Sequence, residues 1–359
     1  MKILYIGALT LGSTSLQRLE ALRSLGHEVV GVETVAAPKL WDSIAPARLL
    51  SRLGYVLDPV DVNRKALEHA AADQFDIVWV DKGRMVRPST LQEIKKRQPR
   101  CRLVSYSPDD MFNPRNSSLQ YRRSLREYDL HVTTKSYNAR ELLTAGARQT
   151  LFVGNAYDPA THRPIELSHA EQNIWSADVS FVGAFEAERC SMLRALVSSG
   201  VQVVVRCTGW DALVGVDNNL RVYPEFLVGE DYARAICGTK VNLCFLRKVN
   251  RDQQTTRSVE IPACGGFMLA ERTPEHLELF EEGREAEYFS TVEELIEKTK
   301  YYLAHDSERL EIAKNARDRC LRSGYSNAER LKAVFSTLKE LEYFNRHKTG
   351  SLQPREGAS

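Results

Sequence analysis

The densest group of side chains that could do chemistry lies between residues 250 and 266. Polar residues gather where a helix from about Thr255 to Cys264 is expected to begin, and backbone N–H groups at a helix start attract anions. With Arg251 or Arg257 beside them, these groups are suited to a diphosphate. Glu260 is suited to a ribose diol, because two carboxylate oxygens match two adjacent hydroxyls. Alternatively, Arg257 and Glu260, at positions i and i+3, form a surface ion pair.

A second group follows a strand expected near residues 103 to 106. Asp109 and Asp110 are adjacent, and their charges repel unless a ligand, a cation or a shifted pKa uses them. Asp109 is therefore a candidate catalytic base or holder of an acceptor hydroxyl, and the alternative is a helix cap after Pro108. The candidate acceptor-side residues, all near expected strand ends, are Gly12, Ser13, Lys82, Tyr106 and Asp110.

The loop after the first expected strand runs from Gly7 to Thr14. Its glycines allow a ligand to approach the backbone, and Ser13 is placed to cap the next helix; a plain tight turn is the alternative. The dinucleotide fingerprint Gly-x-Gly-x-x-Gly is missing, because only Gly7 and Gly12 are present. A dinucleotide-dependent oxidoreductase is therefore the least favoured enzyme class.

Short apolar runs alternate with helical patterns along the chain, which is typical of parallel sheets covered on both faces. We therefore predict an α/β protein with two Rossmann-like domains that face each other across a cleft. The predicted segments are a first domain at 1–155, a hinge or linker at 156–175, a second domain at 176–325, a last helix at 326–345 and a disordered tail at 346–359.

Composition narrows the function classes. Of the 359 residues, 43% are apolar and 27% are charged, which is ordinary for globular domains. The net charge of +2 gives no electrostatic case for a nucleic acid partner. Seven cysteines, with no Cys-x-x-Cys pair, indicate reduced thiols in the cytoplasm and no zinc site. No run of about 18 apolar residues could span a bilayer; peripheral contact at the inner face of the membrane is left open.

The segment Thr255–Phe267, together with Glu275-His276-Leu277, resembles the carboxyl-terminal half of GT-B glycosyltransferases. The most similar group is the CgeB-like (spore maturation protein) family, which is related to the group 1 transferases. In the first half of the chain the likeness includes Tyr106–Asp110 and the hinge Tyr157–Pro164.

Group 1 transferases carry Glu-x7-Glu, in which the second Glu binds the ribose and the first lies near the transferred sugar. Glu260 fits the second position, and Asp252, one methylene shorter, occupies the first. The resemblance implies a loop that faces the diphosphate after the first strand of the second domain, and a loop that borders the nucleobase after the next strand. The donor-binding residues so assigned are Gly183, Arg189, Arg206, Gly209, Arg251, Thr255, Thr256, Arg257 and Glu260, and the catalytic residues are Asp109 and Asp252.

The resemblance implies transfer of a sugar from a nucleotide sugar, with UDP or another nucleoside diphosphate, to a carbohydrate, lipid-linked or other hydroxyl acceptor, as in bacterial polysaccharide biosynthesis. Residues 176–325 would bind the donor and residues 1–155 the acceptor, and the helix at 326–345 would pack back on the first domain. No metal and no cofactor are expected, because amide dipoles and arginines can replace the ion. A nucleotide-sugar 2-epimerase and a non-catalytic nucleotide-sugar binding protein remain as alternatives, and the stereochemistry and oligomeric state stay open.

Overall fold

The computed structural model describes residues 1–35 and 54–350. By their contacts, these residues divide into two compact units. The first unit comprises Met1–Leu9, Arg18–Val153 and the chain from Ala328 onward, and the second comprises Thr10–Gln17 and Gly154–Asn327.

The first unit is built on a six-stranded parallel sheet with the order β2-β1-β3-β4-β5-β6. Its strands are β1 (Lys2–Gly7), β2 (Glu28–Glu33), β3 (Ile77–Asp81), β4 (Arg102–Ser107), β5 (Leu130–Thr133) and β6 (Thr150–Phe152). Every side chain of β3 and β5 is buried, as is every side chain but the first of β1 and β4. Burial on both faces explains why these strands appear in the sequence as short apolar runs without alternation.

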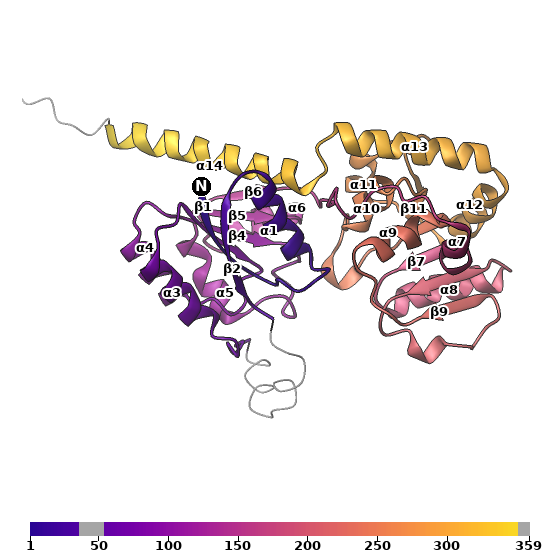
Figure 1. Ribbon diagram of the computed structural model, residues 1–359, viewed down its shortest axis with the longest axis horizontal. Coiled ribbons are helices and arrows are strands. Elements are labelled where there is room, and N and C mark those ends of the chain that lie inside the picture. The colour runs from indigo at the N-terminus through magenta and orange to yellow at the C-terminus, as the bar shows by residue number, and fades with distance from the viewer. Residues whose placement is uncertain (36–53, 351–359) are drawn as a thin grey trace, which may run out of the picture. The chain divides into compact units, whose positions relative to one another are not determined.

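Helices cover both faces of this sheet (Figure 1). They are α1 (Thr14–Ser24), α3 (Val62–Ala72), α4 (Pro88–Arg97), α5 (Leu119–Ser124), α6 (Ser136–Thr144) and α14 (Asn327–Gly350). On one face, Leu22 of α1 and Val334 of α14 join Tyr5 of β1 in one buried cluster. On the other face, Ala66 of α3 and Leu91 of α4 pack with residues of the same strands.

The second unit repeats this plan with a six-stranded parallel sheet of order β12-β11-β10-β7-β8-β9. Its strands are β7 (Ala177–Val182), β8 (Val203–Arg206), β9 (Leu220–Tyr223), β10 (Thr239–Cys244), β11 (Met268–Glu271) and β12 (Glu287–Phe289). Its helices are α7 (His169–Trp175), α8 (Ala187–Ser198), α9 (Glu230–Cys237), α10 (Arg257–Ala263), α11 (Pro274–Leu279), α12 (Val292–Ala304) and α13 (Asp306–Arg322). Phe181 and Val182 belong to different buried clusters, because successive strand residues point to opposite faces.

These two Rossmann-like units confirm the predicted fold class. The strand order of each sheet indicates where a ligand site should lie. The first strand of each unit, β1 or β7, lies inside its sheet, with the following strand on one side and a later strand on the other. Open α/β sheets bind ligands beyond the carboxyl ends of the strands where the order reverses in this way. In the second unit, that place is the end of β7, which Gly183 follows.

Some elements differ from the sequence-based prediction. The helix α7 lies inside the segment predicted as a hinge, and its first turn carries a capping box of Ser168 and Glu171. The elements β9, α9 and β12 were not predicted, because they are short and β9 alternates buried with exposed residues. Residues 346–350, predicted as part of a disordered tail, continue α14; the rest of that tail lies outside the described residues.

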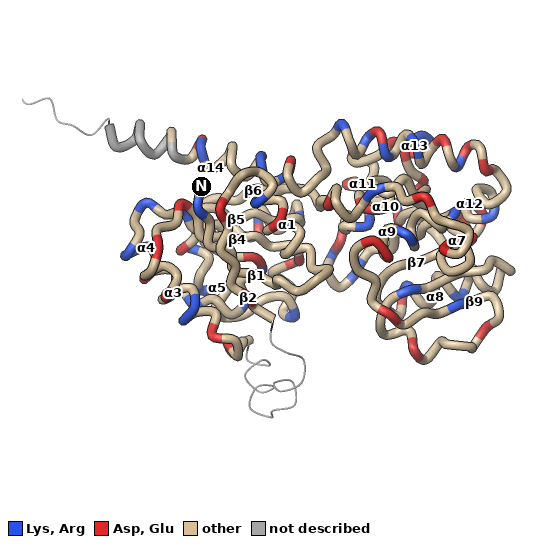
Figure 2. The backbone as a smooth tube through the Cα atoms, in the orientation of Figure 1, with Lys and Arg blue, Asp and Glu red and all other residues tan. Residues whose placement is uncertain are grey.

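The surface charge is mixed in sign, as the composition indicates. Figure 2 shows Lys and Arg interspersed with Asp and Glu along α13. Over residues 1–35 and 54–350, no helix is both long and apolar enough to cross a membrane.

Candidate functional site

Glu260 lies in the first turn of α10 and is only 6% exposed. The hydroxyl of Tyr232, on α9, donates a hydrogen bond to Glu260 Oε2 at 2.8 Å. Burial and the neighbouring carboxylate raise the pKa of Tyr232 well above its usual value, so the phenol keeps its proton and stays a donor. The alternative of a surface ion pair with Arg257 is wrong, because Glu260 is buried and Arg257 Nη2 donates to the carbonyl of Phe245 at 2.9 Å.

Glu260 lines a hollow of the second unit at the carboxyl ends of β7 and β8. Other lining residues are Gly183 and Ala184 after β7, Cys207 after β8, Tyr232 on α9, and Thr256 and Arg257 before and in α10. Only glycine fits at position 183, because a Cβ there would lie 2.6 Å from the Phe181 ring and 3.2 Å from Arg257 Nη1. The hollow therefore lies where the strand order predicts a ligand site.

Two arginines bring positive charge to this hollow. The guanidinium carbons of Arg257 and Arg189 lie 5.3 and 5.4 Å from the centre of the Phe181 ring. Arg257 lines the hollow, and Arg189 Nη1 donates to the carbonyl of Ala184 at 3.0 Å. Within the described part of the chain, Arg189 Nε and Nη2 and Arg257 Nε are buried without a hydrogen-bond partner.

Nearby carboxylates balance this charge only in part. Glu186 Oε1 lies 3.8 Å from Arg189 Nη1, but the same oxygen lies 2.8 Å from Arg247 Nε. Burial, and then the charge of Arg257, lowers the pKa of Arg189 to about 10, which leaves it charged at neutral pH. Buried guanidinium groups with unused N–H donors favour a bound anion. This side of the hollow is suited to a phosphate or diphosphate.

The backbone at the start of α10 offers an anion less than its sequence indicates. The Thr255 N–H donates to Ser258 Oγ at 3.0 Å. The N–H groups of Ser258, Val259 and Glu260 donate to the carbonyls of Thr255 and Thr256. These four donors are used within the turn and are therefore not available to an anion.

Among the described residues that line the hollow, five donor-side candidates are missing: Arg189, Arg206, Gly209, Arg251 and Thr255. Arg206 is stacked between the rings of Trp175 and Tyr223, at 4.6 and 4.2 Å, and donates to the carbonyl of Ile174. Gly209 adopts a φ of 90° beside Phe185, and Arg251, with a φ of 48°, is exposed.

Asp252 is buried in the loop before α10. It accepts hydrogen bonds from Asn250 Nδ2 at 3.0 Å and from the Arg247 N–H at 3.4 Å. In the same loop, Gln254 accepts from the Asn155 N–H at 2.9 Å. Asp252 is thus part of a loop that hydrogen bonds hold in place. It is not among the described residues that line the hollow with Glu260.

In the first unit, the adjacent carboxylates Asp109 and Asp110 have separate environments. Asp109 Oδ2 lies 2.5 Å from Lys82 Nζ, and this pair is partly exposed. Asp110 is 2% exposed, and its Oδ1 accepts from the Phe112 N–H and from Asn138 Nδ2, each at 3.0 Å. Asp110 therefore holds the loop together, whereas Asp109 and Lys82 remain accessible to a ligand.

Tyr106 belongs to a buried polar cluster of the first unit. Its ring is 3% exposed and lies 4.3 Å from the guanidinium carbon of Arg18. Arg18 Nε and the Tyr5 hydroxyl both donate to Asp81 Oδ2 at 2.8 Å. Two other acceptor-side candidates belong to the second unit. Ser13 Oγ accepts the Leu16 N–H at 3.1 Å, which is the helix cap considered in the sequence analysis, and Gly12, with a φ of 82°, lines the same hollow as Glu260.

Sequence reasoning assigned no site role to Tyr232 or His162, both of which line the hollow. Tyr232 lies on α9, which was not predicted, so no pattern pointed to it. His162 lies in the segment predicted as a hinge, where a histidine between turn residues gave no sign of burial.

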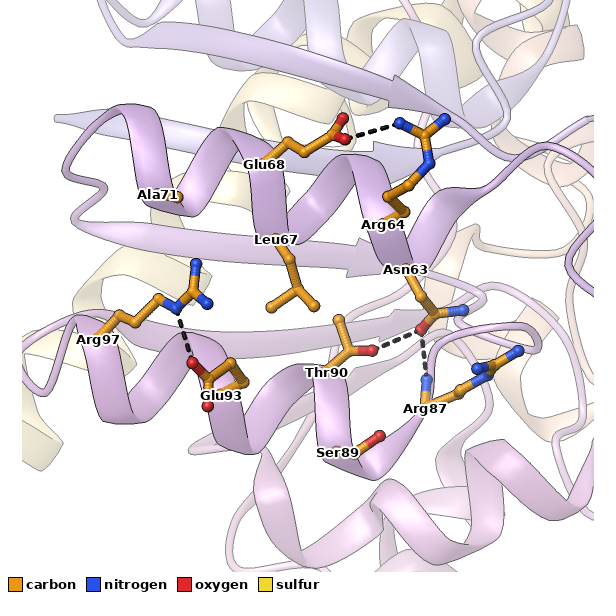
Figure 3. Close-up of a pocket in the computed structure, with 10 residues that line it drawn as sticks. All are labelled: Asn63, Arg64, Leu67, Glu68, Ala71, Arg87, Ser89, Thr90, Glu93 and Arg97. Carbon is orange, nitrogen blue, oxygen red and sulfur yellow. Dashed lines mark hydrogen bonds and ion pairs between the residues drawn. The ribbon is translucent and has the colours of Figure 1, made fainter.

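A hollow of the first unit lies between α3 and α4 (Figure 3). Its charged side chains largely pair with one another, Arg64 with Glu68 and Arg97 with Glu93, each at 2.7 Å. It contains none of the predicted site residues, so it does not alter the location of the candidate site.

Known proteins resemble this chain in fold and, over part of its length, in sequence. Residues 189–336 match a family model described as glycosyl transferase-like. No curated protein sequence matches the chain. The structure of Anabaena HepE in complex with UDP and glucose is 14% identical, with a TM-score of 0.64 over 95% of this chain and 100% of that chain. The chain has the GT-B fold.

Two other solved structures share this GT-B fold. Sucrose-phosphate synthase from Thermosynechococcus elongatus is 11% identical, with a TM-score of 0.65 over 95% of this chain and 99% of that chain. A putative UDP-N-acetylglucosamine 2-epimerase from Listeria monocytogenes is 14% identical, with a TM-score of 0.57 over 96% of this chain and 97% of that chain. The predicted fold is confirmed. Residues 189–336 match the glycosyl transferase-like model, and the CgeB-like group stays a prediction.

Proposed function

We propose that the protein is a glycosyltransferase that moves a sugar from a nucleoside diphosphate sugar to a hydroxyl group. The observation that carries the proposal is the buried carboxylate of Glu260, which shares a hollow with Arg257 at the strand ends. A carboxylate has about four acceptor sites, and the Tyr232 hydroxyl takes one of them. Glu260 therefore retains capacity for both hydroxyls of a ribose.

The arginines Arg257 and Arg189 are proposed to bind the diphosphate. They carry buried N–H groups without a partner among the described residues. A diphosphate has several anionic oxygens close together that can accept hydrogen bonds from these groups. Positive charge here also stabilises the leaving group, since negative charge grows on the departing phosphate oxygen. On this basis we propose that transfer needs no metal ion. The HepE complexes with UDP and with UDP-glucose support a UDP-linked donor.

The acceptor is proposed to bind in the first unit, beside Asp109. The acceptor hydroxyl oxygen would bond to the anomeric carbon of the donor sugar as the nucleoside diphosphate leaves. The carboxylate of Asp109 would take the proton that this hydroxyl loses. Lys82, paired with Asp109, would orient that carboxylate. Asp252 is proposed to lie near the transferred sugar. On the motif Thr255–Phe267 we also propose a CgeB-like enzyme of bacterial polysaccharide biosynthesis that works in the cytoplasm.

Calorimetric titration of UDP, GDP and ADP tests the donor site in the wild type, in Glu260→Ala and in Glu278→Ala. Glu278 is an exposed carboxylate of the same unit and serves as the control. We expect Glu260→Ala to lose at least about tenfold in affinity, or ~1.4 kcal/mol, and Glu278→Ala to bind like the wild type. Unchanged affinity of Glu260→Ala for all three nucleotides overturns the assignment.

Product analysis then identifies the reaction. Incubation of UDP-sugars with a suitable hydroxyl acceptor should yield UDP and the glycosylated acceptor, and slow hydrolysis without an acceptor should yield UDP and the free sugar. Excess EDTA should not change these rates. An epimerised nucleotide sugar would instead indicate a 2-epimerase, and binding without turnover would indicate a binding protein.

A further inference from the structure

His162 lies in the same hollow of the second unit as Glu260 and has no role in the function proposed above. The histidine is 4% exposed, and its Nε2 is 3.8 Å from Glu260 Oε1. Its ring meets the ring of Tyr232 edge-on, with 5.5 Å between the ring centres. Two side chains from separate segments, His162 and Tyr232, therefore lie beside one carboxylate.

The turn before His162 determines which ring nitrogen carries the proton. The Asp158 N–H donates to His162 Nδ1 at 2.9 Å, so Nδ1 acts as the acceptor. In a neutral imidazole the other nitrogen then carries the hydrogen, and Nε2–H is the donor that faces Glu260. The backbone of the turn holds this orientation, because the His162 N–H donates to the Asp158 carbonyl at 2.7 Å. The donor direction is thus set before any ligand binds.

The gap between His162 Nε2 and Glu260 Oε1 is too long for a direct hydrogen bond. A hydroxyl oxygen to one side of the line that joins these atoms could lie about 2.8 Å from both and so bridge them. A hydroxyl group both accepts and donates a hydrogen bond, which matches one donor and one acceptor. Glu260 Oε2, which receives the Tyr232 hydroxyl, keeps room for a second hydroxyl next to the first.

We propose that His162 Nε2–H and Glu260 Oε1 form a donor and acceptor pair that binds one ribose hydroxyl of the nucleotide. This inference rests on the proposed function and adds a binding residue to it. A deoxyribose that lacks the bridging oxygen would leave His162 Nε2 and Glu260 Oε1 unpaired. Because unpaired buried polar atoms are costly, such an analogue should bind much more weakly. The site therefore selects ribonucleotides over one class of deoxynucleotide.

The test measures binding of UDP, 2′-deoxy-UDP and 3′-deoxy-UDP by calorimetry. We expect the wild type to bind UDP at least about tenfold more tightly than one of the two deoxy analogues. His162→Phe keeps a ring against Tyr232 but has no donor, and we expect its preference to fall to about threefold or less. His169→Phe, at an exposed histidine of the same unit, should keep the full preference. His162→Gln, which restores an N–H donor, should recover part of it.

The outcomes separate the two proposals. If the wild type binds none of UDP, GDP and ADP, the proposed function fails, and this inference fails with it. If the wild type binds UDP but does not distinguish it from either deoxy analogue, only the inference is overturned. The same holds if folded His162→Phe keeps the full preference. A melting curve would show whether His162→Phe folds. If it does not, His162→Gln and the binding of the deoxy analogues to the wild type still test the inference. If the protein binds GDP or ADP instead of UDP, the matching deoxy forms are used.

Discussion

The Tyr232 hydroxyl donates to Glu260 Oε2 at 2.8 Å and so joins α9 to α10 at the candidate donor site. The bond satisfies one oxygen of a buried carboxylate, and a buried carboxylate without donors is costly. It also sets the position of that carboxylate before a nucleotide enters. The two residues therefore contribute to both stability and binding, and the two effects can be measured separately.

Tyr232→Phe removes only this donor. We expect nucleoside diphosphate affinity to fall about threefold to tenfold, and the free energy of unfolding to fall by about 1–2 kcal/mol, because Glu260 loses a buried hydrogen bond. Calorimetry and urea denaturation measure the two changes. The control is Tyr301→Phe, whose hydroxyl donates to exposed Glu308 at 2.9 Å and should change stability by less than about 0.5 kcal/mol. Wild-type affinity in Tyr232→Phe would contradict a role in holding Glu260.

Arg189→Met replaces a buried cation with an apolar side chain of similar length. Two guanidinium nitrogens, Nε and Nη2, have no described partner, so loss of the group should change the free energy of unfolding by no more than about 1 kcal/mol. Affinity for UDP should fall at least about tenfold, whereas affinity for uridine, which has no phosphate, should not change. Calorimetry with both ligands measures this difference. The exposed Arg194 of the same helix provides the control Arg194→Met, and equal losses for UDP and uridine would argue against a phosphate contact.

Asp109→Ala and Asp110→Ala compare two neighbouring carboxylates. Asp110→Ala leaves the buried donors of Phe112 and Asn138 without their acceptor, so we expect a loss of about 2–3 kcal/mol in the free energy of unfolding. Asp109→Ala breaks a partly exposed pair with Lys82, and we expect a loss of less than about 1 kcal/mol. Urea denaturation of both variants measures the difference, and the reverse order of stability would show that the two roles are exchanged.

Glu294 gives the stability a specific pH dependence. Hydrogen bonds from Arg272, and then the Ser290 N–H, lower the pKa of Glu294 from 4.5 to about 2. Because the folded pKa lies below the unfolded one, this stabilisation is present above about pH 4.5 and is lost as the pH falls towards 2. The side chain is 27% exposed, so we expect Glu294→Gln to lose about 1–2 kcal/mol at pH 7.

Urea denaturation of the wild type and Glu294→Gln between pH 7 and pH 2.5 measures this effect. The difference in the free energy of unfolding should shrink below pH 4.5. The control Glu293→Gln, at the preceding exposed position, should follow the wild type throughout. A difference that stays constant over this range would show that the Arg272 contact does not stabilise the charged form.

Sequence patterns predicted the elements that have strong local signals. The buried strands β1, β3 and β4 are continuous apolar runs, and Thr255–Cys264 has a polar start and a Gly-Gly end. The strand β9 was missed because it is half exposed, and α9 because it has only eight residues. Because α9 was not predicted, the contact between Tyr232 and Glu260 was not predicted either.

By itself, the sequence determined the two α/β units and the place of Glu260 at the start of a helix, because strands, helices and their ends are encoded by neighbouring residues. Only the tertiary structure decided which side chains are buried and what they contact. It placed Arg189 and Arg257 by the ring of Phe181 and turned His162 towards Glu260. Such contacts join residues far apart in the chain, so their energies depend on packing and exclusion of water that no local pattern contains.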